Sequence, residues 1–489
     1  MKAVIMPPDA PTLMWSTRAI GYTTSAAVAD LIDNSISANA SRIQIQFVSG
    51  ENSYISILDD GAGMSPEALR QAMKYGSGNP WKERSPSDLG RFGLGLKTAS
   101  LSQCRKLTVA SKRDGIISAF CWDLDHVIEA KAWELLELDE EDILQLPQIG
   151  ELQRLSEGTI VLWDKLDKIF VGDDNKEQGL LLKIKEVEEH LSLTFHRYLQ
   201  GEAGLKKLTI TSNGIPLKPT DPFFITRSDE MPSERISVHY INQNGDDAVD
   251  NVIVTPFILP FSDALSQTDL DALGGKDGLI KNQGFYIYRN KRLIVAADWF
   301  RLARKTDLSK LCRVRVDMPN TLDDIWTIDV KKSMAIPPET VLRNLRRIIS
   351  PIIKAGKRKY TFRARDEKSV EKLQLWVPQE TRNGMVYSIN PDYPVLKEIM
   401  DEMKDKRKMQ TFLRLLEQNI PVNAIHTDFY DDKKFAFEDV DIAFQNMLSN
   451  LRALLAEIRP EERAAEFEEL MTIMPFADYD IKYEDLGDI

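Results

Sequence analysis

The chain has 489 residues, of which 43% are hydrophobic and 28% are charged, which is ordinary for a globular protein. The length is enough for roughly two to four domains. The formal net charge is -12, with 63 basic and 75 acidic residues, so a protein whose whole surface binds nucleic acid is excluded. Any contact with a polyanion must therefore be local.

The cysteines and the start of the chain indicate a cytoplasmic protein. Cys104, Cys121 and Cys312 form no CxxC pair, and such an odd, sparse set predicts reduced thiols rather than disulfides or a zinc site. Residues 1–15 contain three prolines and no continuous apolar segment, so they are not expected to be a signal peptide. No apolar run reaches the length of about 18 residues that suggests a transmembrane helix, which disfavours a membrane sensor.

The first part of the chain mixes helices and strands. Residues 24–38 carry apolar side chains at helical spacing, with Thr24 or Ser25 as the N-cap. Residues 75–95 are rich in Gly, Pro and Ser and predict a long mobile loop. The other expected elements are strands at 42–48, 54–59, 106–112, 115–123 and 158–166, and helices at 65–73, 96–104 and 186–199, with Ser65 as the cap of the first of these helices.

The remainder predicts a second α/β domain and then a helical region. Strands are expected at 205–214, 251–259, 284–295 and 311–319, followed by a helix at 337–356. Amphipathic helices are expected at 368–377, 393–403, 408–419, 437–458 and 461–474. The expected domains are therefore 1–203, 204–365 and 366–489.

The helix at 24–38 places two polar groups together. Asp30 and Asn34 are four residues apart, so their side chains point from one face into the same volume. A carboxylate can orient or deprotonate a water, and a carboxamide oxygen can bind Mg²⁺, both of which ATP hydrolysis requires. Taken alone, this pair is more often a solvated helix face.

Two glycine-containing segments follow this helix. In DDGAGM, Asp59 ends a strand and can accept a hydrogen bond from the amine of adenine, while Gly61 and Gly63 permit close backbone approach. The alternative is a plain turn. The second segment has Gly90, Gly93 and Gly95 before a helix that carries Lys97, and such a loop can surround phosphate with backbone N–H groups.

The glycine-rich segment fits neither of two common phosphate-binding motifs. It is not GxxxxGK[ST], so it is not a P-loop. No strand leads directly into it, so it is not a Rossmann fingerprint.

Taken in this order, the three segments resemble the ATP site of the GHKL superfamily. Their amino-acid sequences are most similar to those of bacterial MORC-like and MutL-like ATPases. The resemblance covers roughly residues 15–350. It implies an α+β fold, with a Bergerat-type α/β sandwich that binds ATP, a transducer-like α/β domain and a helical C-terminal region. The implied ligands are ATP and Mg²⁺.

The resemblance also implies residue roles. In the family, the helix Asn holds Mg²⁺, the first Asp of DxGxG accepts the adenine amine, the glycine lid covers the phosphates, and a Thr after Gly on a later strand helps to bind adenine. The nucleotide-binding positions carried over are Asn34, Asp59, Gly61, Gly63, Met64, Gly90, Gly93, Leu94, Gly95, Lys97, Thr98 and Thr159.

One position departs from the family pattern. Hydrolysing members usually carry Glu where this chain has Asp30. Aspartate keeps the carboxylate but is one methylene shorter, so hydrolysis is expected to be slow, because a misplacement of about 1 Å is costly for catalysis. Asp33 is a poorer candidate for the base, since the equivalent position in relatives is often acidic without that role.

The positions of the histidines and the second domain indicate the branch of the superfamily. Sensor kinases carry an acceptor His before this domain, whereas all five histidines here come after the three ATP-site segments. The second domain resembles the transducer of topoisomerase, MutL and MORC-type ATPases, in which a loop lysine reaches the γ-phosphate. Lys331 and Lys332 are the candidates, and a solvated basic pair is the alternative.

A local basic cluster is the one feature that points to nucleic acid. Residues 343–365 are densely basic, and Arg346, Arg347, Lys357 and Arg358 are the candidate phosphate contacts. Pairing of this helix with acidic parts of the chain is an equal alternative.

Relatives of this branch dimerise when ATP is bound, and bacterial MORC-like members are associated with defence genes. The resemblance therefore implies an ATP-gated homodimeric clamp or switch in DNA transactions, with a role in defence and a protein partner from a defence gene set. The rival hypothesis is a chaperone-like or scaffold ATPase that holds a protein partner. A third is a nucleotide-binding module without turnover.

Overall fold

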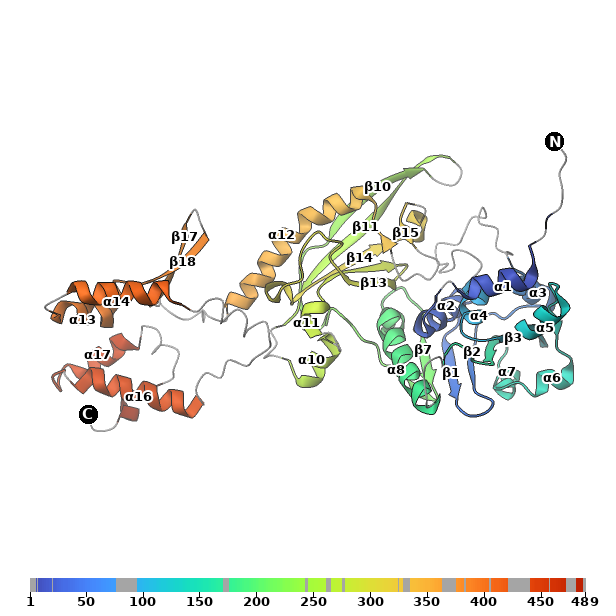
Figure 1. Ribbon diagram of the computed structural model, residues 1–489, viewed down its shortest axis with the longest axis horizontal. Coiled ribbons are helices and arrows are strands. Elements are labelled where there is room, and N and C mark those ends of the chain that lie inside the picture. The colour runs from blue at the N-terminus through green and yellow to red at the C-terminus, as the bar shows by residue number, and fades with distance from the viewer. Residues whose placement is uncertain are drawn as a thin grey trace. The chain divides into compact units, whose positions relative to one another are not determined.

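The protein is described by a computed structural model, and its chain divides into two compact units, Met1–Thr361 and Phe362–Ile489 (Figure 1). The structure describes all residues except 1–5, 7, 20, 76–94, 170–175, 242–244, 261–264, 275–277, 324, 329–334, 363–374, 382–383, 404–405, 421–439, 457, 472–480 and 487–489. In the described part of the chain, no helix is both long and apolar enough to cross a bilayer.

The first sheet has the strand order β5-β4-β3-β6-β2-β1-β7-β8. Its strands are β1 Arg42–Val48, β2 Tyr54–Asp59, β3 Lys106–Arg113, β4 Ile116–Asp123, β5 Leu136–Glu137, β6 Gly158–Asp164, β7 Thr209–Ser212 and β8 Ile215–Pro216. The helices around it are α1 Ala10–Arg18, α2 Thr24–Ser37, α3 Pro66–Met73, α4 Gly95–Leu101, α5 Leu124–Ala130, α6 Glu140–Leu144, α7 Ile149–Arg154, α8 Lys176–Thr194 and α9 His196–Gln200. The mixed α/β fold expected from the sequence is confirmed.

The strand expected within 205–214 is present, but it belongs to the first sheet. Residues of β7 pair in parallel with β1, and Ile210 lies opposite Ile43 in the same buried cluster. A boundary at residue 203 would therefore cut this sheet. The pairing joins segments more than 150 residues apart, so no local pattern in the sequence reveals it.

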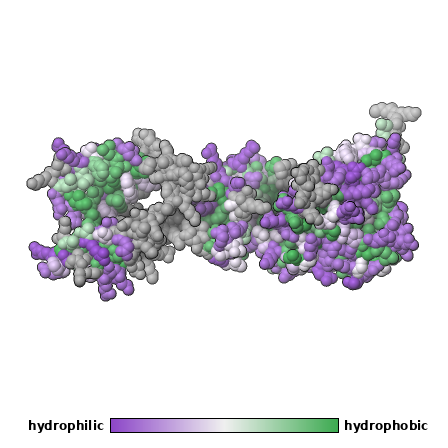
Figure 2. Space-filling view, turned by 60° about the horizontal axis from the view of Figure 1, so that its bottom comes forward, coloured by the Kyte–Doolittle hydropathy of each residue, from purple (hydrophilic) through white to green (hydrophobic). Residues whose placement is uncertain are grey.

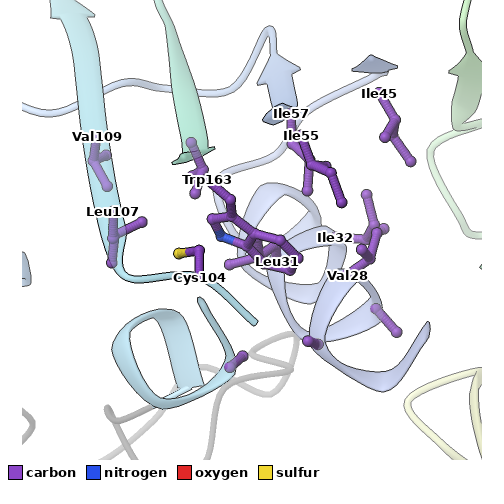
Figure 3. Close-up of a cluster of buried hydrophobic side chains, with 14 of the residues drawn as sticks. Val28, Leu31, Ile32, Ile45, Ile55, Ile57, Cys104, Leu107, Val109 and Trp163 are labelled. Carbon is purple, nitrogen blue, oxygen red and sulfur yellow. The ribbon is translucent and has the colours of Figure 1, made fainter. Parts of the chain in front are cut away.

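The main core lies between one face of this sheet and the helices. Figure 3 shows Val28, Leu31 and Ile32 of α2 beside strand residues and Trp163 of β6. The buried side chains of β2 belong alternately to the two faces of the sheet, because successive residues of a strand point to opposite faces. Ile55 and Ile57 join this main core, whereas Leu58 joins a smaller cluster on the other face, which includes residues of α6 and α7.

Local capping sets where two of these helices begin. Ser65 caps α3 as expected, and its side chain accepts a hydrogen bond from the N–H of Ala68. The expected cap of α2 is wrong: Thr23, and not Thr24 or Ser25, is the cap, and its hydroxyl accepts a hydrogen bond from the N–H of Ala26. The three cysteines are buried and free, as the sparse set predicted.

The second sheet has the order β10-β11-β14-β12-β13, with β9 paired to β11. Its strands are β9 Asp229–Glu230, β10 Glu234–Ile241, β11 Asp247–Ile258, β12 Gly284–Arg289, β13 Arg292–Asp298 and β14 Cys312–Met318. The other elements of this part are α10 Gln267–Gly274, α11 Gly278–Lys281, η3 Asp307–Ser309, η4 Asn320–Leu322, β15 Thr327–Ile328, β16 Ala335–Ile336 and α12 Glu339–Phe362. The apolar stripe of α12 packs into the core of the second sheet through Val341, Leu345, Ile348 and Ile352.

The second unit combines helices with one hairpin. Its elements are β17 Trp376–Thr381, β18 Gly384–Ile389, α13 Pro394–Glu402, α14 Lys406–Gln418, α16 Val440–Ala456, α17 Arg463–Leu470 and η6 Tyr483–Leu486. The expectation of a helix at 368–377 is wrong for its described residues, because those from Trp376 onward form β17. Trp and Val, which begin this strand, both favour β-structure. Hydrophilic residues predominate on the visible face of the first unit, whereas apolar residues gather on the second (Figure 2).

Candidate functional site

Helix α2 brings Asp30 close to the start of α4. The Asp30 side chain is buried, and its Oδ2 accepts a hydrogen bond of 2.9 Å from the hydroxyl of Tyr22. A Cβ atom placed on Gly95 would lie 3.6 Å from the same oxygen. The residue that the sequence nominates as the base therefore adjoins the point where residues 76–94 lead into α4.

Asn34 lies one turn further along α2 and is exposed to solvent. An exposed carboxamide next to a buried carboxylate fits Mg²⁺, which usually keeps several waters and is completed by substrate phosphates. Among the described residues there is no cluster of three or more His, Cys, Asp or Glu side chains that could hold a metal by themselves.

Asp59 ends β2 as a buried carboxylate with a fixed orientation. Its Oδ2 accepts from the Ser35 hydroxyl of α2 at 2.8 Å, and its Oδ1 accepts from the N–H of Gly61 at 2.9 Å. Burial raises the pKa of Asp59, while the hydrogen bonds from Ser35 and Gly61 act against that rise. These contacts hold the carboxylate in one position, as recognition of a flat base requires.

Asp60 has a different role from Asp59. Its carboxylate accepts from the backbone N–H groups of Ser41 and Arg42 and from the Ser41 hydroxyl, at 2.7 to 2.8 Å. It therefore ties the end of β2 to the start of β1.

The glycines after Asp59 are required by the protein's own packing. A Cβ on Gly61 would come within 2.8 Å of the Ala38 side chain. Gly63 has φ +58, and a Cβ there would lie 2.0 Å from the carbonyl oxygen of Lys112, so an L side chain would be strained and would clash. The glycines thus pack closely against Ala38, at the end of α2, and against Lys112 of β3. These contacts restrict the backbone of the turn to one conformation.

Strand β6 places Thr159 next to this turn. Thr159 pairs with Asp59 in the sheet register, and its hydroxyl is 2.9 Å from that of Ser111 on β3. The Ser111 hydroxyl also accepts from the N–H of Met64 at 2.9 Å. The structure therefore brings Asp59, Met64 and Thr159 together.

Sequence reasoning missed Ser35 and Ser111, the two hydroxyl residues that connect this site. Ser35 directly follows Asn34, so its place beside the ATP-binding positions was a usable signal. Ser111 lies in an alternating strand and carries no motif of its own.

Lys97 and Thr98 lie in α4, immediately after the glycine-rich segment. Lys97 is only 1% exposed, and its Nζ donates to the carbonyl oxygen of Ala72 in α3 at 2.6 Å. Burial lowers the pKa of Lys97 to about 8. In this state the amino group contacts α3, and its approach to phosphate stays a prediction. Thr98 is also buried.

Several predicted positions lie outside the described residues. They are Gly90, Gly93 and Leu94 of the expected lid and Lys331 and Lys332 of the expected γ-phosphate contact. Of the basic cluster, Arg346 and Arg347 are exposed on α12, and Arg347 forms a 3.0 Å ion pair with Glu234. The side chains of Lys357 and Arg358 are not described.

Comparisons with known proteins agree with this geometry. Residues 22–159 match the family described as histidine kinase-, DNA gyrase B- and HSP90-like ATPase. The ATPase morc-1 of Caenorhabditis elegans is 34% identical over 95 residues, which are 19% of this chain and 11% of that protein.

Two DNA mismatch repair proteins named MutL are also similar. The protein from Dictyoglomus turgidum is 29% identical over 115 residues, or 23% of this chain and 20% of the relative. The protein from Pelotomaculum thermopropionicum is 36% identical over 96 residues, or 19% and 16%. The match spans no more than a fifth of the length of any of these three relatives. The chain therefore contains a GHKL ATPase domain at residues 22–159 that is similar to those of MORC and MutL proteins.

Proposed function

We propose that this chain binds Mg·ATP and hydrolyses it at the site formed by α2, the end of β2 and the start of α4. The observation that supports this best is Asp59, a buried carboxylate held by Ser35 and Gly61 beside the helix that carries Asp30 and Asn34. A buried carboxylate with a fixed orientation is suited to accept a hydrogen bond from an exocyclic amine.

Three residues divide the chemistry in this proposal. Asp59 binds the adenine amine, and Asn34 supplies a carboxamide oxygen to Mg²⁺, which neutralises developing charge on the phosphates. Asp30 orients and deprotonates the attacking water. Its short side chain and its hydrogen bond from Tyr22 limit its reach, so turnover is slow.

We further propose that ATP gates a homodimeric clamp that acts on DNA, with a role in bacterial defence. Support comes from the similarity to an ATPase and to DNA mismatch repair proteins, and from exposed arginines on α12. A second candidate is a scaffold that holds a protein partner. Phe412, Leu415 and Leu416 favour it, because they leave apolar surface of α14 exposed by 43% to 54%.

Replacing Asp59 by Asn should weaken ATP binding by at least about tenfold, because the loss of a buried charged acceptor typically costs ~1.5–3 kcal/mol. Isothermal titration with ATP measures the affinity. Asp60→Asn is the matched control and should bind ATP as the parent does, since Asp60 ties β2 to β1 instead. Equal ATP affinity in Asp59→Asn and the parent would contradict the assignment.

Replacing Asp30 by Asn should leave ATP binding intact and slow hydrolysis by about 10²-fold or more, the usual contribution of a general base. Steady-state phosphate release gives kcat, and titration with ATP shows that the site is still formed. If Asp30→Asn turns over ATP at the parental rate, another group is the base.

A non-hydrolysable ATP analogue should convert the protein to a dimer, with more monomer in its absence, because bound phosphate orders switch segments in such ATPases. The double change Lys331→Ala and Lys332→Ala should keep nucleotide binding but abolish this conversion. Light scattering measures the mass in each state. One constant mass in every nucleotide state would rule out gating.

Charge reversal at Arg346, Arg347, Lys357 and Arg358 should reduce DNA affinity and its salt dependence, since each neutralised phosphate releases counterion. Affinity should be higher with the ATP analogue, because two copies raise the effective concentration. Sequence preference should be weak. Fluorescence anisotropy at several salt concentrations measures these effects.

The matched control reverses four exposed lysines elsewhere on the first unit, at Lys131, Lys168, Lys207 and Lys218. This variant should keep the DNA affinity of the parent. Absence of DNA binding by the parent at low salt, even with the analogue, would favour the protein-partner function.

A further inference from the structure

We infer that Arg292 is a positioning residue, through which the second domain holds α2, and with it Asp30 and Asn34, in place for hydrolysis. The inference rests on the proposed ATPase function. It assigns a role to Asp33, which the proposed chemistry does not use, and to a residue 259 positions away in the sequence.

A buried ion pair joins the second sheet to the helix of the candidate ATP site. Nε of Arg292, at the start of β13, donates to Oδ1 of Asp33 in α2 at 3.3 Å. The two side chains are 4% and 0% exposed. The guanidinium carbon also lies 5.9 Å from the centre of the Phe195 ring, and Nη1 donates to the carbonyl oxygen of Leu293 at 2.9 Å. Arg292 is thus fixed by its own neighbours as well as by Asp33.

Arg292 places a positive charge beside Asp33 at this junction. His190 of α8 also lies near Asp33, but burial, with a smaller contribution from the charge of Arg292, lowers the pKa of this histidine to about 4. His190 is therefore neutral near pH 7.

The free energy of burying two charges indicates that this ion pair fixes a position and does not only add stability. The desolvation of two buried charges costs so much free energy that a protein with a well-packed apolar pair in their place is often as stable. Removal of only one partner, in contrast, strongly destabilises the fold, because it leaves an unpaired buried charge. A buried pair of this kind resists separation and fixes one relative position of the groups that carry it. Here those groups are a strand of the second sheet and the helix of the ATP site.

Helix geometry carries the constraint to the reacting groups. Asp33 comes three residues after Asp30 and immediately before Asn34, so all three lie within five consecutive residues of α2. A hydrogen-bonded helix moves as a body at this scale, and a shift of Asp33 displaces both neighbours. Since misplacement of about 1 Å can cost 10²-fold in rate, an anchor at Asp33 acts directly on turnover.

The chain offers two matched controls for a variant of Arg292. Arg289 forms a buried ion pair with Asp323 at 2.6 Å within the second domain, three residues before Arg292. Arg197 of α9 forms a buried ion pair with Asp317 of β14, which also joins the two domains but does not involve α2. Arg289→Gln and Arg197→Gln therefore remove buried arginines without releasing Asp33.

The test measures kcat, ATP affinity and melting temperature of the full chain for each variant. We expect Arg292→Gln and Asp33→Asn to lower kcat by about tenfold or more with less than about threefold change in ATP affinity, because a misplaced helix costs rate. Arg292→Lys should restore part of the loss. The apolar pair Asp33→Leu with Arg292→Met should regain melting temperature but not kcat. Both controls should keep the parental kcat.

A double-mutant cycle with Asp30→Asn separates positioning from general destabilisation. Because Arg292 acts through α2, Arg292→Gln should cause no further loss of kcat when Asp30 is already Asn. An additive loss overturns the inference, as does parental kcat in folded Arg292→Lys and Asp33→Asn. If the parent itself does not hydrolyse ATP, the proposed function fails and the inference fails with it. Hydrolysis by the parent with unchanged variants rejects the inference alone.

Discussion

The packing of α2 against the first sheet is the constraint on which the site depends. One side of the helix must be apolar, because Val28, Leu31 and Ile32 are almost wholly buried in the main core. The rest of its surface is then free to carry polar groups. It carries Asp30 and Asn34, and it also supplies the Ser35 hydroxyl that holds Asp59 at the end of β2.

The sheet contributes the second half of the site through close backbone packing. A Cβ on Gly158 would lie 2.4 Å from the carbonyl oxygen of Asp59, and Gly63 crosses Lys112 at a distance that only glycine allows. These contacts leave the turn after β2 little freedom. The carboxylate of Asp59 is consequently positioned before any ligand arrives, which lowers the entropic cost of binding.

Much of this could be predicted from sequence because the signals are local. Helical spacing identified α2, alternation identified β1 and β2, and the order of the motifs placed Asp30, Asn34 and Asp59 in one site. The partners of Asp33 and the pairing of β7 were not predicted, because both depend on contacts between distant segments. The end of the helix expected at 368–377 was also misjudged, since Trp376 begins a hairpin there.

The central claim is that adenine binds at Asp59 with its phosphates beside α2. A crystal structure of the protein with Mg²⁺ and a non-hydrolysable ATP analogue tests it most directly. The account predicts a hydrogen bond from the adenine amine to the Asp59 carboxylate, and Mg²⁺ bound by Asn34 and the phosphates. A nucleotide bound away from Asp59, or a metal held without Asn34, would contradict it.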